Sequence, residues 1–213
     1  LCYMRINKFL SSAGLASRRK CEEFVLQGRV NVNGEVVKNL AFDVSEKDKV
    51  LVDGNRISLP SKYTYLMMHK PKGFLTTLSD DRERKTVMDL LPEEFKMLKP
   101  IGRLDYNSEG LLLFTNDGNF SDYLMRSENH IFKTYYVELE NSVSVDEQQQ
   151  YVVQFGNGIF LEGEKKAESF VTLPATLEWI SDKSCNITIC EGKFHQVRRM
   201  FFAMKNEVTF LKR

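Results

Sequence analysis

The run from Gly110 to Thr115, Gly-Leu-Leu-Leu-Phe-Thr, is the segment that most restricts the possible folds. Four consecutive large apolar residues, bounded by Gly110 and by the turn residues Asn116-Asp117-Gly118, are typical of a buried strand. Asp105 lies in the polar segment that leads into this strand. A carboxylate at that place is held by a rigid element yet stays open in a loop, which suits a nucleophile. The same spacing also fits an ordinary turn aspartate.

The region after residue 63 mixes strand-like and helical segments. The predicted strands are Tyr65–His69, Gly110–Thr115, Tyr135–Leu139 and Asn186–Cys190, and the predicted helices are Val87–Leu91, Phe120–Arg126, Val145–Phe155 and Gln196–Met204. These segments do not follow a regular βαβ order, so we expect an α+β domain at residues 63–213 with a mixed, mainly antiparallel sheet.

The first 60 residues predict a small α/β module of two helices and a small sheet. Apolar residues recur at helical spacing from Ile6 to Ala13, and Ser17 is a good N-cap for a second helix that ends at Gly28. The dipeptide Asn33-Gly34 between alternating valines predicts a β-hairpin. We place this module at residues 4–60, with a linker near residues 58–63.

Charge is unevenly distributed along the chain, although the formal net charge is only +1. Residues 1–62 hold eleven Lys and Arg against seven Asp and Glu, a net charge of +4. The remainder holds 19 basic and 22 acidic residues, a net charge of −3. Arg18-Arg19-Lys20 fall in the first turn of the second helix, where the helix dipole disfavours cations. This distribution indicates that the N-terminal module binds a polyanion.

The four cysteines (Cys2, Cys21, Cys185 and Cys190) have no paired C-x-x-C spacing, so we expect no zinc site and no disulfide. Reduced thiols are typical of a cytoplasmic protein. The chain contains no apolar run long enough for a membrane helix. We also find no Gly-rich phosphate loop and no Ser/His/Asp set, which disfavours other transferases and hydrolases.

Four blocks in order resemble the ribosomal RNA pseudouridine synthase family, in its small-subunit uridine branch. The first two are His69-Lys70-Pro71-Lys72-Gly73 and Gly102-Arg103-Leu104-Asp105 with the following Gly110–Gly118; the others are Lys133-Thr134-Tyr135-Tyr136-Val137 and Glu191–Met200. The N-terminal module resembles the αL RNA-binding domain through Arg5–Leu10, Ser17-Arg18-Arg19 and Gly28–Gly34. The resemblance therefore covers the chain from Met4 to its last residue.

The resemblance implies a cofactor-free and metal-free isomerisation of uridine, in which Asp105 attacks either the ribose anomeric carbon or carbon 6 of uracil. It implies that Arg198 forms a salt bridge with Asp105. Tyr135 is expected to stack on the flipped uracil and to assist proton removal from carbon 5. Tyr136 should face the opposite side of its strand. Arg103 is expected to fill the vacated stack or to bind a flanking phosphate.

The implied partner is ribosomal RNA, and we expect a cytoplasmic monomer that does not bind a membrane. The expected RNA contacts are Arg103 and the basic residues Arg5, Lys8, Arg18, Arg19, Lys20, Arg29, Lys70, Lys72 and Arg199, together with His195. For His195 we favour substrate positioning or helix capping over a general-base role. His69 and His130 have weaker claims to a role.

Two alternatives remain open at this point. A non-catalytic RNA-binding or ribosome-assembly factor would use the αL domain alone, and the presence of Asp105, Tyr135 and Arg198 counts against it. The target could lie in small-subunit or in large-subunit RNA, and Phe194-His195 favours the former. Family members usually continue beyond the segment that ends at Arg213, so we expect a short protein or a truncated C-terminus.

Overall fold

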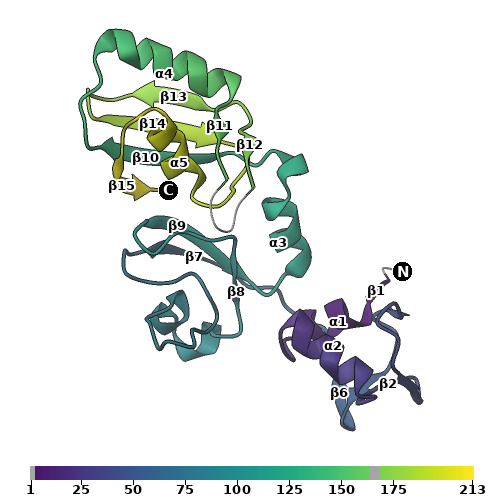
Figure 1. Cartoon of the computed structure of the whole chain (residues 1–213). Coiled ribbons are helices and arrows are strands. Elements are labelled where there is room, and N and C mark those ends of the chain that lie inside the picture. The colour runs from purple at the N-terminus through teal and green to yellow at the C-terminus, as the bar shows by residue number, and fades with distance from the viewer. Residues whose placement is uncertain (1–2, 164–167) are drawn as a thin grey trace. The chain divides into compact units, whose positions relative to one another are not determined.

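The computed structural model describes residues 3–163 and 168–213, and their contacts group them into two units (Figure 1). The first unit runs to Tyr65 and also contains Met97–Lys99 and Thr115–Gly118. The second contains Leu66–Lys96, Pro100–Phe114 and the chain from Asn119 onward. Across the described ranges, no helix is both long and apolar enough to cross a membrane.

The first unit consists of two helices followed by a small antiparallel sheet. Its elements are β1 (Met4–Arg5), α1 (Ile6–Ser12), α2 (Arg18–Leu26), β2 (Val30–Val32), β3 (Glu35–Val37), β4 (Asp43–Val44), β5 (Val50–Val52) and β6 (Asn55–Ile57). The sheet has the order β3-β2-β5-β6, and β1 pairs with β4. The oxygen of Ser17 accepts from Lys20 N at 3.3 Å and caps α2. Asn33 (φ 55°) and Gly34 (φ 99°) both take the left-handed conformation that a tight hairpin turn requires.

The core of this unit is built from the residues that helical and strand periodicity placed inward. Ile6 and Leu10 of α1, Cys21 and Val25 of α2, and Val50 of β5 are all fully buried. Both predicted helices and the predicted hairpin are therefore confirmed. Cysteines 21, 185 and 190 are buried free thiols, while Cys2 lies outside the described residues.

The second unit contains two larger sheets and one two-stranded sheet. Its strands are β7 (Tyr65–Lys70), β8 (Lys99–Ile101), β9 (Gly110–Thr115), β10 (Lys133–Leu139), β11 (Phe160–Leu161), β12 (Phe170–Val171), β13 (Thr176–Trp179), β14 (Ser184–Ile189) and β15 (Val208–Lys212). The sheets have the orders β7-β9-β8, β13-β14-β10-β15 and β11-β12, and every pairing in the second and third is antiparallel. The expected α+β class with a mainly antiparallel sheet is confirmed.

The end of β15 joins the two larger sheets, as Figure 1 shows by its place beside β9. Glu109 N donates to Leu211 O and Arg213 N donates to Glu109 O, each at 3.0 Å. Gly110 (φ 111°) lies against the end of β15, where a Cβ atom would overlap the backbone of Arg213. A glycine is therefore required at the first residue of β9 for the sheets to meet.

Helices α3 (Gly118–Met125), α4 (Val145–Asn157) and α5 (Gln196–Ala203) belong to this region of the chain. Tyr151 and Phe155 of α4 contact Phe201 of α5, and Tyr151 also contacts Trp179 of β13. The predicted strands and these three predicted helices agree with the structure to within two residues at each end.

The segment predicted as a helix at Val87–Leu91 is instead a 3₁₀ turn, η1 (Val87–Leu90). Thr86 and Asp89 form a capping box at its start, and Leu91 already has an extended backbone (φ −86°, ψ 137°). The residue before a proline is restricted away from helical angles, so Pro92 ends the segment after one turn. Two further short 3₁₀ turns are η2 (Glu93–Phe95) and η3 (Ser127–Asn129).

Candidate active site

The loop that carries Asp105 is a tight turn in front of β9. Ser108 N donates to Asp105 O at 3.0 Å, and Leu104 is buried beneath the turn. Thr76 fixes Leu104 from a neighbouring segment: its hydroxyl donates to Leu104 O at 2.7 Å and accepts from Leu104 N at 3.2 Å. The apolar strand that follows is buried on one face only: Leu112 and Phe114 have 0% exposure, whereas Leu111 is exposed, so the expected burial holds for one side of the strand. A rigid strand and a buried threonine therefore position the turn.

Lys70, the last residue of β7, lies under this turn with no exposed surface. Its ammonium donates to Asp105 O at 3.0 Å, Ser108 O at 2.8 Å and Pro71 O at 3.1 Å. Burial lowers the pKa of Lys70, and the negative charges of Asp105 and Glu109 partly oppose that shift. The expected contact between Lys70 and an RNA phosphate is wrong, because the buried ammonium is already bonded to the backbone.

The two remaining carbonyls of the turn are bonded as well. Gly73 N donates to Tyr106 O at 2.8 Å, and Arg198 Nη2 donates to Asn107 O at 3.4 Å. Every backbone carbonyl from Asp105 to Ser108 thus has a donor. This arrangement holds the turn in one conformation while the Asp105 side chain stays 34% exposed.

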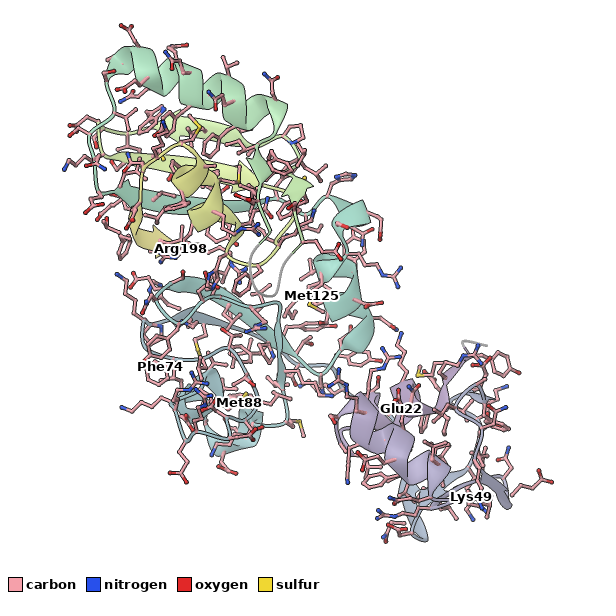
Figure 2. The ribbon with its side chains drawn as sticks, in the orientation of Figure 1. Glu22, Lys49, Phe74, Met88, Met125 and Arg198 are labelled. Carbon is pink, nitrogen blue, oxygen red and sulfur yellow. The ribbon has the colours of Figure 1, made fainter. Side chains whose placement is uncertain are left out.

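Arg198 (labelled in Figure 2) connects this turn to the C-terminal strand, since its Nη1 donates to Val208 O at 2.8 Å. The resemblance implies a salt bridge between Arg198 and Asp105, but the structure places the guanidinium on backbone carbonyls. The carboxylate of Asp105 faces another cation-forming group instead: His195 Nε2 lies 3.6 Å from Asp105 Oδ1. A catalytic role for Arg198 stays a prediction, while the salt bridge itself is not formed here.

Tyr135 lies in the inward row of β10, opposite Ile187 of β14, and is 8% exposed. Tyr136 is in the outward row, where it pairs with Lys212 and contacts the ring of Phe210 edge-on at 6.0 Å. The expected opposite orientation of the two tyrosines is confirmed by this alternation. Tyr135 therefore has its phenol on the buried side of the sheet.

Comparisons with known proteins give the family of this chain. A family model described as RNA pseudouridylate synthase matches residues 64–203, and a model of the S4 domain matches residues 4–50. The chain belongs to the RNA pseudouridylate synthase family. It is accordingly an enzyme of the isomerase class, and the family expected from its motifs is confirmed.

Two curated relatives and one solved structure illustrate the likeness. The chain is 37% identical over 209 residues to ribosomal large subunit pseudouridine synthase B of Bacillus subtilis (strain 168), covering 98% of this chain and 84% of that protein. It is 37% identical over 211 residues to ribosomal small subunit pseudouridine synthase A of Escherichia coli (strain K12), covering 99% and 87%. A crystal structure of a pseudouridylate synthase matches with a TM-score of 0.68 and 31% identity, covering 98% and 86%. Equal identity to both rRNA enzymes leaves the expected small-subunit branch a prediction.

Within this pseudouridylate synthase region, the remaining basic residues fall into two groups. Arg103 and Lys72 are exposed, and Lys72 lies 4.2 Å from the centre of the Phe210 ring. Arg199 is only 7% exposed, and its guanidinium donates to Phe194 O at 3.4 Å and Glu162 O at 2.5 Å. The expected RNA contact of Arg199 is wrong, because this largely buried side chain connects α5 by a hydrogen bond to Glu162, the residue that follows β11.

In the S4 domain the predicted RNA-binding residues differ in their local bonding. Arg18, Arg19 and Lys20 are exposed at the first turn of α2, and Lys20 pairs with Glu23 at 2.6 Å. Arg5 is hydrogen-bonded to Ala41 O and lies 3.4 Å from Asp43. Arg29 donates to Asp53 and stacks on Phe24, and the side chain of Lys8 is half-buried. Arg18 and Arg19 are thus the exposed basic pair at the start of this helix.

Sequence reasoning missed the roles of Thr76 and Lys70. For Lys70 the sequence offers only the two-residue period of a strand, since Tyr65 to Met68 are apolar or aromatic on both faces; the structure shows that the face with half-buried Leu66 and Met68 is the inward one. Lys70 continues the inward row, so its side chain points into the domain. Thr76 offers no such signal, since it lies in an irregular segment and contacts a residue 28 positions away.

Proposed function

We propose that the protein converts uridine to pseudouridine in ribosomal RNA, with Asp105 as the nucleophile and without a cofactor. The observation that supports this best is the Asp105 turn. Its backbone carbonyls are all bonded, whereas the carboxylate itself is 34% exposed. A nucleophile held in this way can meet a nucleotide without reorganising its loop, which lowers the entropic part of the barrier.

The proposed reaction begins with attack of an Asp105 oxygen on the ribose anomeric carbon or on carbon 6 of uracil. The bond between N1 and the anomeric carbon breaks, the uracil rotates, and carbon 5 bonds to the anomeric carbon. The bond between the Asp105 oxygen and the nucleoside also breaks, which frees the carboxylate. Carbon 5 loses its proton and N1 gains one. Substrate and product are isomers, so the net reaction consumes no water and no oxidant or reductant. One carboxylate is enough, unlike the pair that glycoside hydrolysis requires.

Two cations bonded to the turn complement the negative charge of the proposed nucleophile. The ammonium of Lys70 binds Asp105 O, and Arg198 binds the adjacent Asn107 O. Both cations are fixed by hydrogen bonds, so their field acts on the carboxylate without reorganisation. In the proposed mechanism Arg198 is a catalytic residue through this charge, and Tyr135 stacks on the uracil and assists proton removal from carbon 5.

RNA binding in this proposal uses the S4 domain for affinity and exposed residues near the turn for the target nucleotide. Arg18, Arg19, Lys20, Arg29 and Lys72 are exposed and can reach phosphates. Arg103 fills the space of the flipped base or binds a flanking phosphate, since a base within folded RNA must leave the stack to react. We propose that the protein acts as a monomer in the cytoplasm, where its ribosomal RNA substrate is found.

The test is pseudouridine mapping of unmodified ribosomal RNA incubated with the wild-type protein, with Asp105→Asn and with Asp182→Asn. Asp182 is an exposed aspartate on the β13–β14 turn, so its variant should retain full activity. Asp105→Asn is nearly isosteric and should bind RNA but form no pseudouridine. The modified position also identifies the subunit, and Phe194-His195 leads us to expect the small one. RNA binding by the wild type without any new pseudouridine would contradict the proposal and favour an assembly factor.

A further inference from the structure

His195 has a left-handed backbone, with φ 48° and ψ 28°. A residue with a Cβ atom adopts this conformation at a cost that glycine would avoid. His195 is the N-cap of α5, but its side chain makes no capping hydrogen bond. The imidazole is therefore available for another contact. Strained backbone conformations of this kind cluster at functional sites.

Hydrogen bonds of the neighbouring residues hold the backbone of His195 in this left-handed conformation. The side chain of Gln196, 3% exposed, donates to Glu191 Oε1 at 2.7 Å and accepts from Lys193 N at 3.0 Å. Gln196 N donates to Lys193 O at 3.1 Å, and Arg199 N donates to His195 O at 3.0 Å. The backbone that carries the imidazole is thus held by hydrogen bonds within its own segment.

The imidazole lies between one aromatic ring and the nucleophile. Its ring stacks on Phe194 with centroids 3.9 Å apart and an interplanar angle of 15°. Its Nε2 is 3.6 Å from Asp105 Oδ1. That separation is too long for a hydrogen bond, so the contact is mainly one of charge and requires the protonated imidazole.

We propose that His195 is a positioning residue for Asp105: the protonated imidazole holds the carboxylate in the orientation from which it attacks the nucleoside. The backbone of Asp105 is fixed by Lys70, but the side chain keeps its own rotational freedom. His195, 90 positions further along the sequence, restricts that freedom. The role in catalysis rests on the proposed function of Asp105, whereas the electrostatic contact can be measured without any activity.

Other charged groups near His195 attract or repel a positive charge on its imidazole. Lys70 and Arg198 are bonded to the same turn and repel a positive charge on the imidazole, whereas Asp105 attracts it. On its own side of the chain, Lys193 lies 3.7 Å from Glu191 and Arg199 is bonded to Phe194 O and Glu162 O.

The first measurement is a double-mutant cycle on the free energy of unfolding at pH 6, with Asp105→Asn, His195→Gln and the two substitutions together. The two effects should not be additive, because each substitution removes the same contact. Asp105→Asn combined with His130→Gln is the matched control and should be additive, because His130 is exposed and also left-handed, with φ 47°. Additive effects of Asp105→Asn and His195→Gln would overturn the proposal whether or not the protein is active.

The second measurement is kcat/KM for pseudouridine formation as a function of pH in the wild type, His195→Gln and His130→Gln. The ratio of wild type to His195→Gln should be about two- to five-fold near pH 6, as for other partly exposed ion pairs. It should approach one near pH 8, because the neutral imidazole no longer attracts the carboxylate. His130→Gln should match the wild type throughout.

The outcomes separate this inference from the proposed function. An inactive wild type in which Asp105 and His195 are still energetically coupled contradicts the proposed function and removes the catalytic role of His195 with it. An active wild type with a pH-independent ratio shows that His195 matters only for structure and overturns the inference alone.

Discussion

Lys70 and Asp105, 35 positions apart, are joined by a hydrogen bond of 3.0 Å from the buried ammonium to the backbone carbonyl. The same ammonium binds Ser108 O, so a single side chain spans the turn that presents the carboxylate. A buried cation bonded only to neutral carbonyls is unusual, since burial of a charge requires compensating bonds. Here those bonds connect the end of β7 to the proposed nucleophile.

Replacement of Lys70 by methionine should destabilise the protein and lower its turnover. Methionine fills a similar volume but leaves the carbonyls of Asp105 and Ser108 without this donor, at a cost of about 1–3 kcal/mol. Chemical denaturation measures the stability and single-turnover kinetics measures the reaction. Lys72→Met is the matched control: Lys72 is exposed, and its removal should cost less than about 1 kcal/mol. Equal effects of the two variants would contradict the role assigned to Lys70.

A Cβ atom at Gly110 should disturb the junction of the two sheets. Alanine at this position would lie 2.7 Å from Arg213 N in addition to adopting an unfavourable φ of 111°. We expect Gly110→Ala to cost about 3 kcal/mol or more by denaturation. Gly102→Ala has the strain of a positive φ (71°) but no atom within 4 Å of its Cβ, so it should cost only about 1 kcal/mol. Similar losses of stability in the two variants would mean that the backbone of Arg213 moves aside easily when a Cβ atom is added at Gly110.

Arg198→Ala should reduce turnover more than it reduces RNA binding. The variant loses the donors to Asn107 O and Val208 O, and charge-assisted bonds of this kind contribute roughly 1.5–3 kcal/mol, or about ten- to hundredfold in rate. Arg198→Lys keeps the charge but cannot bond both carbonyls in the same way, so its loss should be intermediate. Unaffected turnover in Arg198→Ala would show that another cation supports Asp105.

Replacing Arg18 and Arg19 together by alanine should weaken ribosomal RNA binding and flatten its salt dependence. Each lost phosphate contact reduces the slope of log K against log salt by about one. Binding curves at several salt concentrations measure this slope. Lys47→Ala removes an exposed charge of the same unit outside α2 and should leave the slope nearly unchanged. An unaltered slope in the double variant would place the RNA elsewhere on the S4 domain.

The stability of the folded protein should depend on Asp80 at acid pH. Hydrogen bonds from the Arg84 side chain, and from the Arg82 and Arg84 amides, lower the pKa of the Asp80 carboxyl to about 2 from 3.8. Its stabilising contribution is thus complete above pH 3.8 and is lost as pH falls towards 2. In Asp80→Asn the melting temperature should fall less steeply over this range, with Asp81→Asn as the control. If the melting temperatures of Asp80→Asn and the wild type fall in parallel as the pH is lowered, the low pKa of Asp80 is contradicted.

Much of the local structure could be predicted because it depends on short-range patterns. Ser17 and the apolar spacing of α2 define that helix, and Asn33-Gly34 defines a hairpin, within a few residues each. The opposite orientations of Tyr135 and Tyr136 follow from strand alternation. The two-residue period of β7 places Lys70 on the same face as Leu66 and Met68, but only the structure shows that this face is the inward one.

The sequence by itself determined the helices other than the one expected at Val87–Leu91, the four long strands β7, β9, β10 and β14, the order of the motifs and the expectation that Asp105 is the nucleophile. Tertiary structure alone decided which group faces that carboxylate: His195 lies 3.6 Å away, while Arg198 and Lys70 bond to the backbone of its turn. The physical reason is distance along the chain. Caps, turns and periodicity involve residues about four positions apart, whereas these contacts arise only when β7, β9 and α5 pack together and buried cations must find acceptors.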